Sequence, residues 1–296
     1  MSFCFALGAT IRTQSVTSTS HLLEGLGLSH RYGFGGHKIV AVDGVNISLS
    51  SGEAVGLVGE SGSGKSTLGR LLAGLETPDD GEVRWQGETL AHRKWSAQRV
   101  KRVYRSGVQM VFQDPYGSLD PEQTAIQAVA EAVKVWNSKL SRREVESVAS
   151  RLLRSVRISG EQMLRKPRDL SGGQRQRVSI ARALAPNPKA LIADEPTASI
   201  DQSAQVGVLS LLGGLRTAGL GILLISHDLR VIQDFTDRVF VMKSGRIVES
   251  GKTAIVFSNP TDPYTKELLN SIPKGWRDLG VLNNPSLRRY SSINGN

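Results

Sequence analysis

The feature that most constrains this chain is a glycine-rich stretch of nine residues, Gly59–Thr67, with the sequence GESGSGKST. It stands between a short apolar run, Ala54 to Val58, and a helical pattern of leucines that begins at Leu68. Glycines let the backbone wrap around a phosphate chain with its N–H groups pointing inward, and the helix that follows adds about half a positive charge at its start. The order of strand, glycine-rich turn and helix therefore predicts a phosphate-binding loop. Lys65 is expected to reach the β- and γ-phosphates, and Ser66 to hold Mg²⁺ through its hydroxyl.

Length and composition are those of an ordinary soluble globular protein. The 296 residues, 39% hydrophobic and 22% charged, suffice for one large or two small domains. No uninterrupted apolar stretch approaches the length of roughly 18 residues that a membrane-spanning helix needs. If this protein serves a membrane process, we expect the membrane-spanning part to belong to another chain. Cys4 is the only cysteine, which excludes an internal disulfide and a cysteine-based metal cluster.

The charge balance favours anionic partners. Lys and Arg number 37 against 27 Asp and Glu, for a net charge of +10. Basic residues are densest from Arg93 to Arg105. We interpret this run as the solvated face of a helix. Trp95 and Tyr104 are too few to form a stacking platform for single-stranded nucleic acid, so we predict no nucleic-acid partner.

The flanking and inserted segments differ in character from the rest. Residues 1–20 are rich in Ser and Thr and fit a disordered tail or an early start codon better than an organelle transit peptide. From Leu26 the pattern alternates in the manner of strands. Farther on, apolar residues recur at helical spacing from Ile126 to Val133, and Ser141 with Glu144 forms a capping box before another such pattern. We expect two amphipathic helices inserted as a subdomain.

Two apolar strand patterns end in polar residues. Leu191 to Ala193 is followed by Asp194 and Glu195, and Gly221 to Ser226 is followed by His227. Carboxylates at the carboxyl end of a parallel strand sit where such sheets bind ligands. Asp194 is predicted to hold Mg²⁺ through its water shell, and Glu195 to polarise an attacking water. His227 could contact a γ-phosphate or position the water, although a lone histidine is more often structural.

Two single residues are weaker signals. Gln113 follows an apolar strand pattern and precedes Pro115, where its amide could reach a metal ion or a water; an ordinary loop glutamine is the alternative. Tyr32 lies in a glycine-rich setting, where its ring could stack on a purine. A buried tyrosine at a strand edge fits the pattern of Tyr32 equally well.

A second glycine-containing motif, LSGGQ, opens another helical pattern. It consists of Leu170, Ser171, Gly172, Gly173 and Gln174. Ser171 and Gln174 have the spacing of a capping box, and the two glycines between them expose the first backbone N–H groups of the helix. The motif therefore predicts a second anion-binding helix start.

Together these motifs resemble the ATP-binding subunit of an ABC transporter, over roughly Leu26 to Gly251. The likeness assigns the Walker B aspartate to Asp194, and catalytic roles to Glu195, the switch histidine His227 and the Q-loop glutamine Gln113. Mg²⁺ is assigned to Ser66, Gln113 and Asp194, the contact across a subunit pair to Asp201, and the signature peptide to Leu170–Gln174. ATP binding is assigned to Tyr32, Gly59, Glu60, Ser61, Gly62, Ser63, Gly64, Lys65, Ser66 and Thr67.

Two strings narrow the resemblance to the dipeptide, oligopeptide and nickel importer branch. They begin at Gln113 and at Asp262, and read QDPYGSLDP and DPYTKELL. Asp120 replaces the usual asparagine, Glu122 stands where arginine is common, and Asp262 replaces the usual histidine. The segment before Asp201 also departs from the family's SALD, reading ASID. These departures leave the substrate class open.

The resemblance implies an α/β fold of the P-loop NTPase type, with a RecA-like core, an antiparallel β subdomain and an inserted α-helical subdomain. The expected divisions are a disordered tail over residues 1–25, an ATPase domain over 26–255 with its helical part at about 120–185, and an importer-type tail over 256–296. ATP and Mg²⁺ are the implied cofactors.

The resemblance also implies an assembly. Two such subunits pair head to tail, so that Ser171 and Gly173 of one contact the γ-phosphate held by Lys65 of the other. The expected partners are two integral-membrane permease subunits, a second and different ATPase subunit, and an extracytoplasmic substrate-binding protein, with this chain at the cytoplasmic face of the inner membrane.

Uptake of di- and oligopeptides is the function expected from this branch, with nickel or a metal chelate as the alternative cargo. A soluble ABC ATPase acting on ribosomes or DNA is disfavoured, because neither two cassettes nor a long coiled-coil insertion is visible. Intact Lys65, Asp194, Glu195 and His227 disfavour a non-catalytic subunit. An exporter would often carry a fused membrane domain, and the tail string favours import.

Overall fold

The computed structural model describes residues 21–33, 38–89, 104–114, 117–198 and 200–271 of the chain. The predicted tail up to residue 20, most of the basic run from Arg93 and the end of the importer-type tail lie outside these ranges. Within them, the strands form a six-stranded and a four-stranded sheet. No helix in the described ranges combines the length and the apolar character that crossing a membrane requires.

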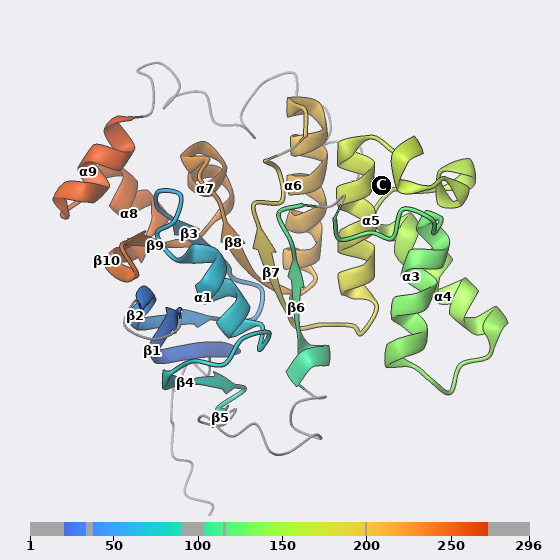
Figure 1. Ribbon diagram of the computed structural model, residues 1–296. Helices are drawn as coiled ribbons and strands as arrows, with labels where there is room; N and C mark the ends of the chain where they lie inside the picture. Colours follow the sequence, from blue (N-terminus) through green and yellow to red (C-terminus); the bar gives the residue numbers. More distant parts are fainter. Residues whose placement is uncertain (1–20, 34–37, 90–103, 115–116, 199, 272–296) are drawn as a thin grey trace, which may run out of the picture.

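The six-stranded sheet has the order β10-β9-β3-β8-β7-β6 (Figure 1). All neighbouring pairs are parallel except β10 and β9. The strands are β3 (Ala54–Val58), β6 (Val108–Val111), β7 (Ala190–Asp194), β8 (Gly221–Ile225), β9 (Arg238–Lys243) and β10 (Arg246–Lys252). Every residue of β3, β7 and β8 is buried, as expected of parallel strands covered on both faces. Their carboxyl ends therefore deliver Gly59, Glu195 and His227 to one edge of the sheet.

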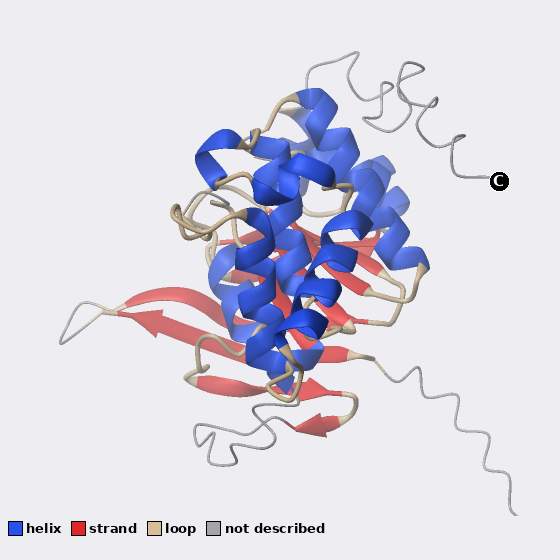
Figure 2. Cartoon of the chain, turned by 90° about the vertical axis from the view of Figure 1, so that its right-hand side faces the viewer, coloured by secondary structure: helices blue, strands red, loops and turns tan. Residues whose placement is uncertain are grey.

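The four-stranded sheet is antiparallel, with the order β2-β1-β4-β5. Its strands are β1 (Leu23–Tyr32), β2 (Ile39–Leu49), β4 (Asp80–Trp85) and β5 (Glu88–Thr89). Gln86 and Gly87 have φ angles of 52° and 81°, which suit the tight turn of the hairpin between β4 and β5. In Figure 2 these strands lie toward the bottom of the molecule and most helices above them.

Two boundaries differ from the sequence analysis. β1 begins at Leu23 rather than at residue 26, because Leu22 and Leu23 are buried and Leu23 pairs with Leu49 of β2. Residues 23–25 therefore belong to the sheet and not to the predicted tail. The two apolar runs on either side of Gly44 form one strand, because Gly44, with φ of 63°, lets β2 continue through the irregularity.

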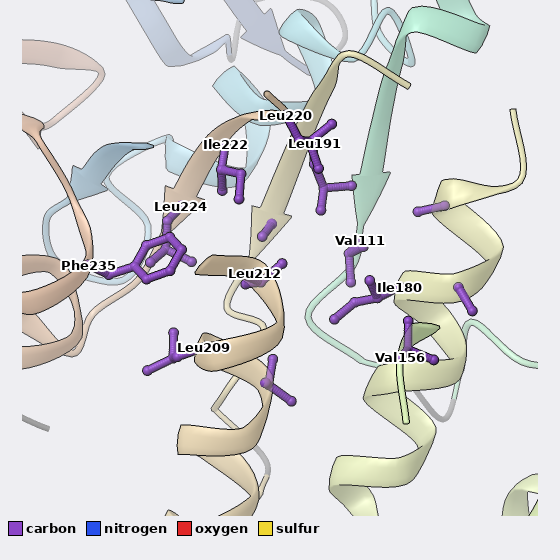
Figure 3. Close-up of a cluster of buried hydrophobic side chains, with 14 of the residues drawn as sticks. Val111, Val156, Ile180, Leu191, Leu209, Leu212, Leu220, Ile222, Leu224 and Phe235 are labelled. Atoms are coloured by element: carbon purple, nitrogen blue, oxygen red, sulfur yellow. The ribbon is translucent and has the colours of Figure 1, made fainter. Parts of the chain in front are cut away.

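Helix α1 (Lys65–Leu72) lies between the two sheets and contacts β1, β2, β7 and β8. Leu68 and Leu71 are fully buried in the core cluster that the two sheets share. The opposite face of the six-stranded sheet is covered by α5 (Gly172–Leu184), α6 (Gln202–Thr217) and α7 (Leu229–Phe235). Figure 3 shows side chains of this second core, among them Ile180, Leu212 and Phe235.

The inserted helices form as predicted. They are α3 (Ala125–Trp136) and α4 (Arg142–Ser155), followed by short 3₁₀ turns at Gly160–Leu164 and Pro167–Asp169. Ser141 and Glu144 make the expected capping box at the start of α4. Helices α3 and α4 pack against each other and against α5, at the right of Figure 1. At the other end of the chain, α8 (Thr253–Ser258) and α9 (Pro263–Asn270) pack beside β10.

Candidate active site

A groove of about 620 Å³ lies at the carboxyl edge of the six-stranded sheet. The phosphate loop forms one part of its wall, and residues that follow β6, β7 and β8 form another. The lining residues are Tyr32, Ile39, Val40, Ala41, Ser61, Gly62, Gly64, Lys65, Ser66, Thr67, Gln113, Glu195 and His227. The fold thus brings predicted site residues from five separate segments into the same groove.

Two glycines allow the phosphate loop to pack directly against neighbouring backbone. Gly59 has φ of 150° and Gly64 has φ of 106°, values that L-amino acids rarely adopt. A Cβ on Gly59 would lie 2.1 Å from the carbonyl oxygen of Met242, and one on Gly64 would lie 2.0 Å from that of Ala41. Any side chain at either position would therefore displace the loop from β9 or from β2.

The Lys65 ammonium lies over the loop. It donates hydrogen bonds to the carbonyl oxygens of Gly59 and Glu60, at 2.8 Å and 2.7 Å. Burial lowers the pKa of Lys65, and the carboxylates of Glu195 and Asp194 oppose that shift. An ammonium held by two carbonyl groups can exchange them for phosphate oxygens, which form stronger charge-assisted bonds.

Asp194 and Ser66 offer oxygen ligands that fit Mg²⁺. The Ser66 side chain is hydrogen-bonded to the Asp194 carboxylate, and burial raises the pKa of Asp194. Its Oδ1 is buried and has no hydrogen-bond partner among the described residues. An unpaired buried carboxylate oxygen is costly unless it meets a cation, and Mg²⁺ prefers oxygen ligands. The described residues hold no group of three or more His, Cys, Asp or Glu that could hold a metal ion without further ligands.

Glu195 and His227 are joined across β7 and β8. The backbone of Glu195 has φ of 48°, and its N–H donates to the carbonyl oxygen of Ile225 at 2.9 Å. Its carboxylate accepts the backbone N–H of His227 at 3.1 Å and lies 2.8 Å from the ring Nδ1. The His227 ring can donate an Nδ1–H to this carboxylate. A carboxylate fixed in this way can receive a proton from a water in the groove.

Tyr32 lines the groove and is not the buried strand-edge residue of the alternative interpretation, because 38% of it is exposed. Its hydroxyl donates to Glu76 at 2.6 Å and lies 3.3 Å from the Thr67 hydroxyl. The His30 ring packs edge-on against it, with centroids 4.8 Å apart. Glu76 also accepts a bond from Arg70 at 2.7 Å. These contacts hold the ring at the mouth of the groove.

The signature peptide and Asp201 lie elsewhere. Leu170–Gln174 do not line the groove; they begin α5, which packs with α3 and α4, and Ser171 and Gln174 form the predicted capping box. Asp201 caps α6 by accepting the N–H of Ala204 at 2.9 Å and the hydroxyl of Ser203 at 2.6 Å. These two bonds lower the pKa of Asp201, the Ser203 hydroxyl most. The two predicted anion sites are therefore separate within this chain.

Sequence reasoning missed contacts made by the tail string. Asp262, one of the departures, caps α9 by accepting the N–H groups of Tyr264 and Thr265. An acid directly before Pro263 at the start of an apolar helix was the available signal. The neighbouring Tyr264 reaches the phosphate loop, where its hydroxyl accepts the N–H of Glu60 at 2.9 Å. No local pattern indicates that second contact.

Residues 42–198 match the model of a protein family described as ABC transporter, which is more than half of the chain. The chain belongs to the ABC transporter family. It is similar to the oligopeptide transport ATP-binding protein OppF of Salmonella typhimurium, with 44% identity over 79% of this chain and 69% of that protein. It is also similar to the dipeptide transport ATP-binding protein DppF of Escherichia coli, with 40% identity over 88% of this chain and 79% of that protein.

Among solved structures, the fold is similar to the ATP-binding cassette MJ0796, determined as a dimer in a post-hydrolysis state with ADP and Pi. The TM-score is 0.69 at 30% identity, over 78% of this chain and 98% of that one. These findings confirm the predicted fold class and family. The chain is an ABC-type ATPase.

Proposed function

We propose that this chain hydrolyses ATP to drive peptide uptake, as the ATPase subunit of an import complex at the cytoplasmic face of the inner membrane. The observation that carries the catalytic part is the pairing of Glu195 with His227 in the groove that also holds Lys65. Glu195 acts as the general base for the attacking water, and His227 orients that carboxylate. Tyr32 stacks on adenine at the groove mouth.

The phosphate end of the nucleotide is held by Lys65 and the loop N–H groups. Bound Mg²⁺ would neutralise the charge on the β- and γ-phosphates, and Ser66, Asp194 and Gln113 would hold it. Support comes from the unpaired buried oxygen of Asp194 and from the position of Gln113 in the wall of the same groove.

A second subunit completes the site. Because Ser171 and Gly173 do not line the groove of their own chain, we infer that they contact the γ-phosphate held by a partner ATPase. Asp201, exposed at the start of α6, faces that partner. The dimeric state named for the similar cassette supports pairing. We propose a related but different subunit as the partner, so that the pair is a heterodimer.

A further groove is suited to the permease subunits. It measures about 710 Å³ and runs between β6, α3 and α5, starting beside Gln113. Phe112 and Val135 line it with 43% and 64% of their surfaces exposed, and Asp114, Glu131 and Arg182 add charges. A short amphipathic segment of a membrane subunit fits this mixture. Movement of Gln113 on ATP binding would be transmitted there.

Peptides are the proposed cargo because the relatives named for oligopeptide and dipeptide transport match most of this chain. An extracytoplasmic binding protein would deliver them.

The tagged Glu195→Gln protein, purified from detergent-solubilised membranes with ATP and Mg²⁺, should co-elute with two polytopic proteins and a second ATPase. Deletion of the gene should then abolish uptake of a labelled tripeptide. If the deletion abolished uptake of labelled nickel and not of the peptide, nickel would be the cargo. Co-elution of ribosomal proteins in place of membrane proteins would overturn the proposal.

A further inference from the structure

The C-terminal helix α9 contacts the phosphate loop through one side chain. The hydroxyl oxygen of Tyr264 accepts the backbone N–H of Glu60 at 2.9 Å, across 204 positions of sequence. Tyr264 is buried, with 5% of its surface exposed, and it lies outside the residues that match the family model.

Helix α9 is held in place by its own N-terminal contacts. The Glu249 carboxylate on β10 accepts the N–H and the hydroxyl of Thr261, both at 2.8 Å, and the N–H of Asp262 at 3.1 Å. Asp262 in turn caps the helix. The Lys243 ammonium at the end of β9 lies 4.4 Å from the centre of the Tyr264 ring, a cation–π contact. These contacts fix helix α9, and with it the position of the Tyr264 hydroxyl beside the phosphate loop.

The residue that Tyr264 contacts is also a hydrogen-bond partner of Lys65. The N–H of Glu60 is bonded by Tyr264, and its carbonyl oxygen is bonded by the Lys65 ammonium at 2.7 Å. We propose that Tyr264 is a positioning residue for ATP binding, which fixes the first turn of the phosphate loop and, through Glu60, the resting place of the Lys65 ammonium. The C-terminal segment is then a functional part of the nucleotide site.

The electrostatic setting keeps the Tyr264 hydroxyl in the form that this role requires. Burial raises the pKa of the Tyr264 phenol; the bond from the Glu60 N–H opposes that shift, and the nearby carboxylates of Glu60 and Glu267 add to it. The group therefore remains a neutral phenol, whose oxygen accepts the Glu60 N–H. A second bond, from the N–H of Gly245 to the carbonyl oxygen of Ser63 at 2.9 Å, anchors the other end of the turn. Loss of the Tyr264 bond would free the end of the turn that carries the two carbonyl groups bonded by Lys65.

Tyr264→Phe tests the proposal because it removes the hydroxyl and keeps the ring over Lys243. Binding of ATP and Mg²⁺ is measured in the full-length chain carrying Glu195→Gln, so that no nucleotide is consumed. We expect a Kd about two- to tenfold higher, the range for one lost hydrogen bond. In the Glu195 background, KM for ATP should rise by a similar factor, while kcat at saturating ATP changes by less than about twofold.

Thr265→Val is the matched control. It removes a buried hydroxyl from the next residue of the same helix, on the side of the Glu249 carboxylate and not of the loop. Its Kd for ATP should equal that of the parent, even if both variants lower the melting temperature. An unchanged Kd in Tyr264→Phe, or an equal rise in Thr265→Val, would overturn the proposal and leave α9 a structural element only.

A measurement on the unmutated chain covers the case in which Tyr264→Phe does not fold. Amide hydrogen exchange of Glu60 should be slow without nucleotide, because a buried hydroxyl holds its N–H. The N–H of Ser61, which has no hydrogen-bond acceptor among the described residues, provides an internal reference from the same loop. Exchange of Glu60 at the rate of an unprotected amide would contradict the proposal.

Discussion

The Glu195 carboxylate accepts the backbone N–H of His227 at 3.1 Å and stands 2.8 Å from its ring Nδ1. Two contacts from one residue fix both the position and the plane of the carboxylate. Glu195 itself sits at a left-handed φ of 48° directly after β7, and His227 follows β8, so adjacent parallel strands set the pair. The groove therefore contains a preoriented carboxylate beside the phosphate loop.

His227→Ala should slow ATP hydrolysis while leaving ATP bound. The backbone N–H of residue 227 would still reach Glu195, but the ring that orients the carboxylate would be lost. A misplaced general base costs about 10²-fold in rate, so kcat should fall by about that factor with little change in the Kd for ATP. His21→Ala is the matched control, because His21 contacts Ser50 away from the groove. Equal rates for both variants would remove His227 from the mechanism.

Asp194→Asn should abolish Mg²⁺-dependent hydrolysis without lowering the stability of the metal-free chain. Burial raises the pKa of Asp194 above its usual 3.8, so the folded chain binds this proton more tightly than the unfolded chain does. The stability that Asp194 contributes therefore falls as the pH rises from about 3.8 through the raised pKa, and then levels off. Denaturant unfolding without Mg²⁺ should show the wild type losing stability relative to the variant across that window. A variant that is less stable at neutral pH would contradict this account.

Tyr32→Ala should weaken ATP binding by about ten- to hundredfold, the range for losing one base-stacking contact. Tyr32→Phe keeps the ring and loses only the hydrogen bonds of the hydroxyl, to Glu76, Thr67 and Arg70, so its Kd should rise by less than about tenfold. Both values can be measured with a fluorescent ATP analogue. If the two variants bind equally poorly, the hydroxyl and not the ring is what matters.

Removal of the residues after Lys274 should leave ATPase activity within about twofold of the full chain, because that segment carries no nucleotide motif. A shorter chain ending at Asn259 loses α9 and, with it, the contact of Tyr264 to Glu60. Its KM for ATP should rise, whereas that of the longer truncation should not. Steady-state hydrolysis by the two truncations separates these expectations.

Local sequence patterns predict much of the fold and most of the residues that line the groove. The strand, loop and helix around Lys65 lie within 19 residues, from Ala54 to Leu72, and each part has its own signal. The capping boxes at Ser141 and Ser171 depend only on residues three positions apart, and both form. The residues after the buried strands meet at one edge because parallel strands share a direction.

Local sequence patterns could not predict the contacts between segments that are distant in sequence. Nothing near Tyr264 or Glu60 in sequence indicates that the two meet. The position of α9 depends on the bond between Glu249 of β10 and Thr261, which lies just before the helix. Glu76 likewise contacts Tyr32 only because α1 packs under β1. The start of β1 was missed because Leu23 lies in a short segment whose burial comes from pairing with β2.

The most direct test of the central claim compares ATP hydrolysis by the purified transport complex containing the wild-type chain or Glu195→Gln, with bound nucleotide quantified in the same samples. Glutamine keeps an oxygen that can accept the His227 N–H but cannot take a proton from water. The account predicts turnover lowered by about 10² to 10⁴, with intact ATP retained in the complex. Hydrolysis at the wild-type rate would mean that another residue activates the water.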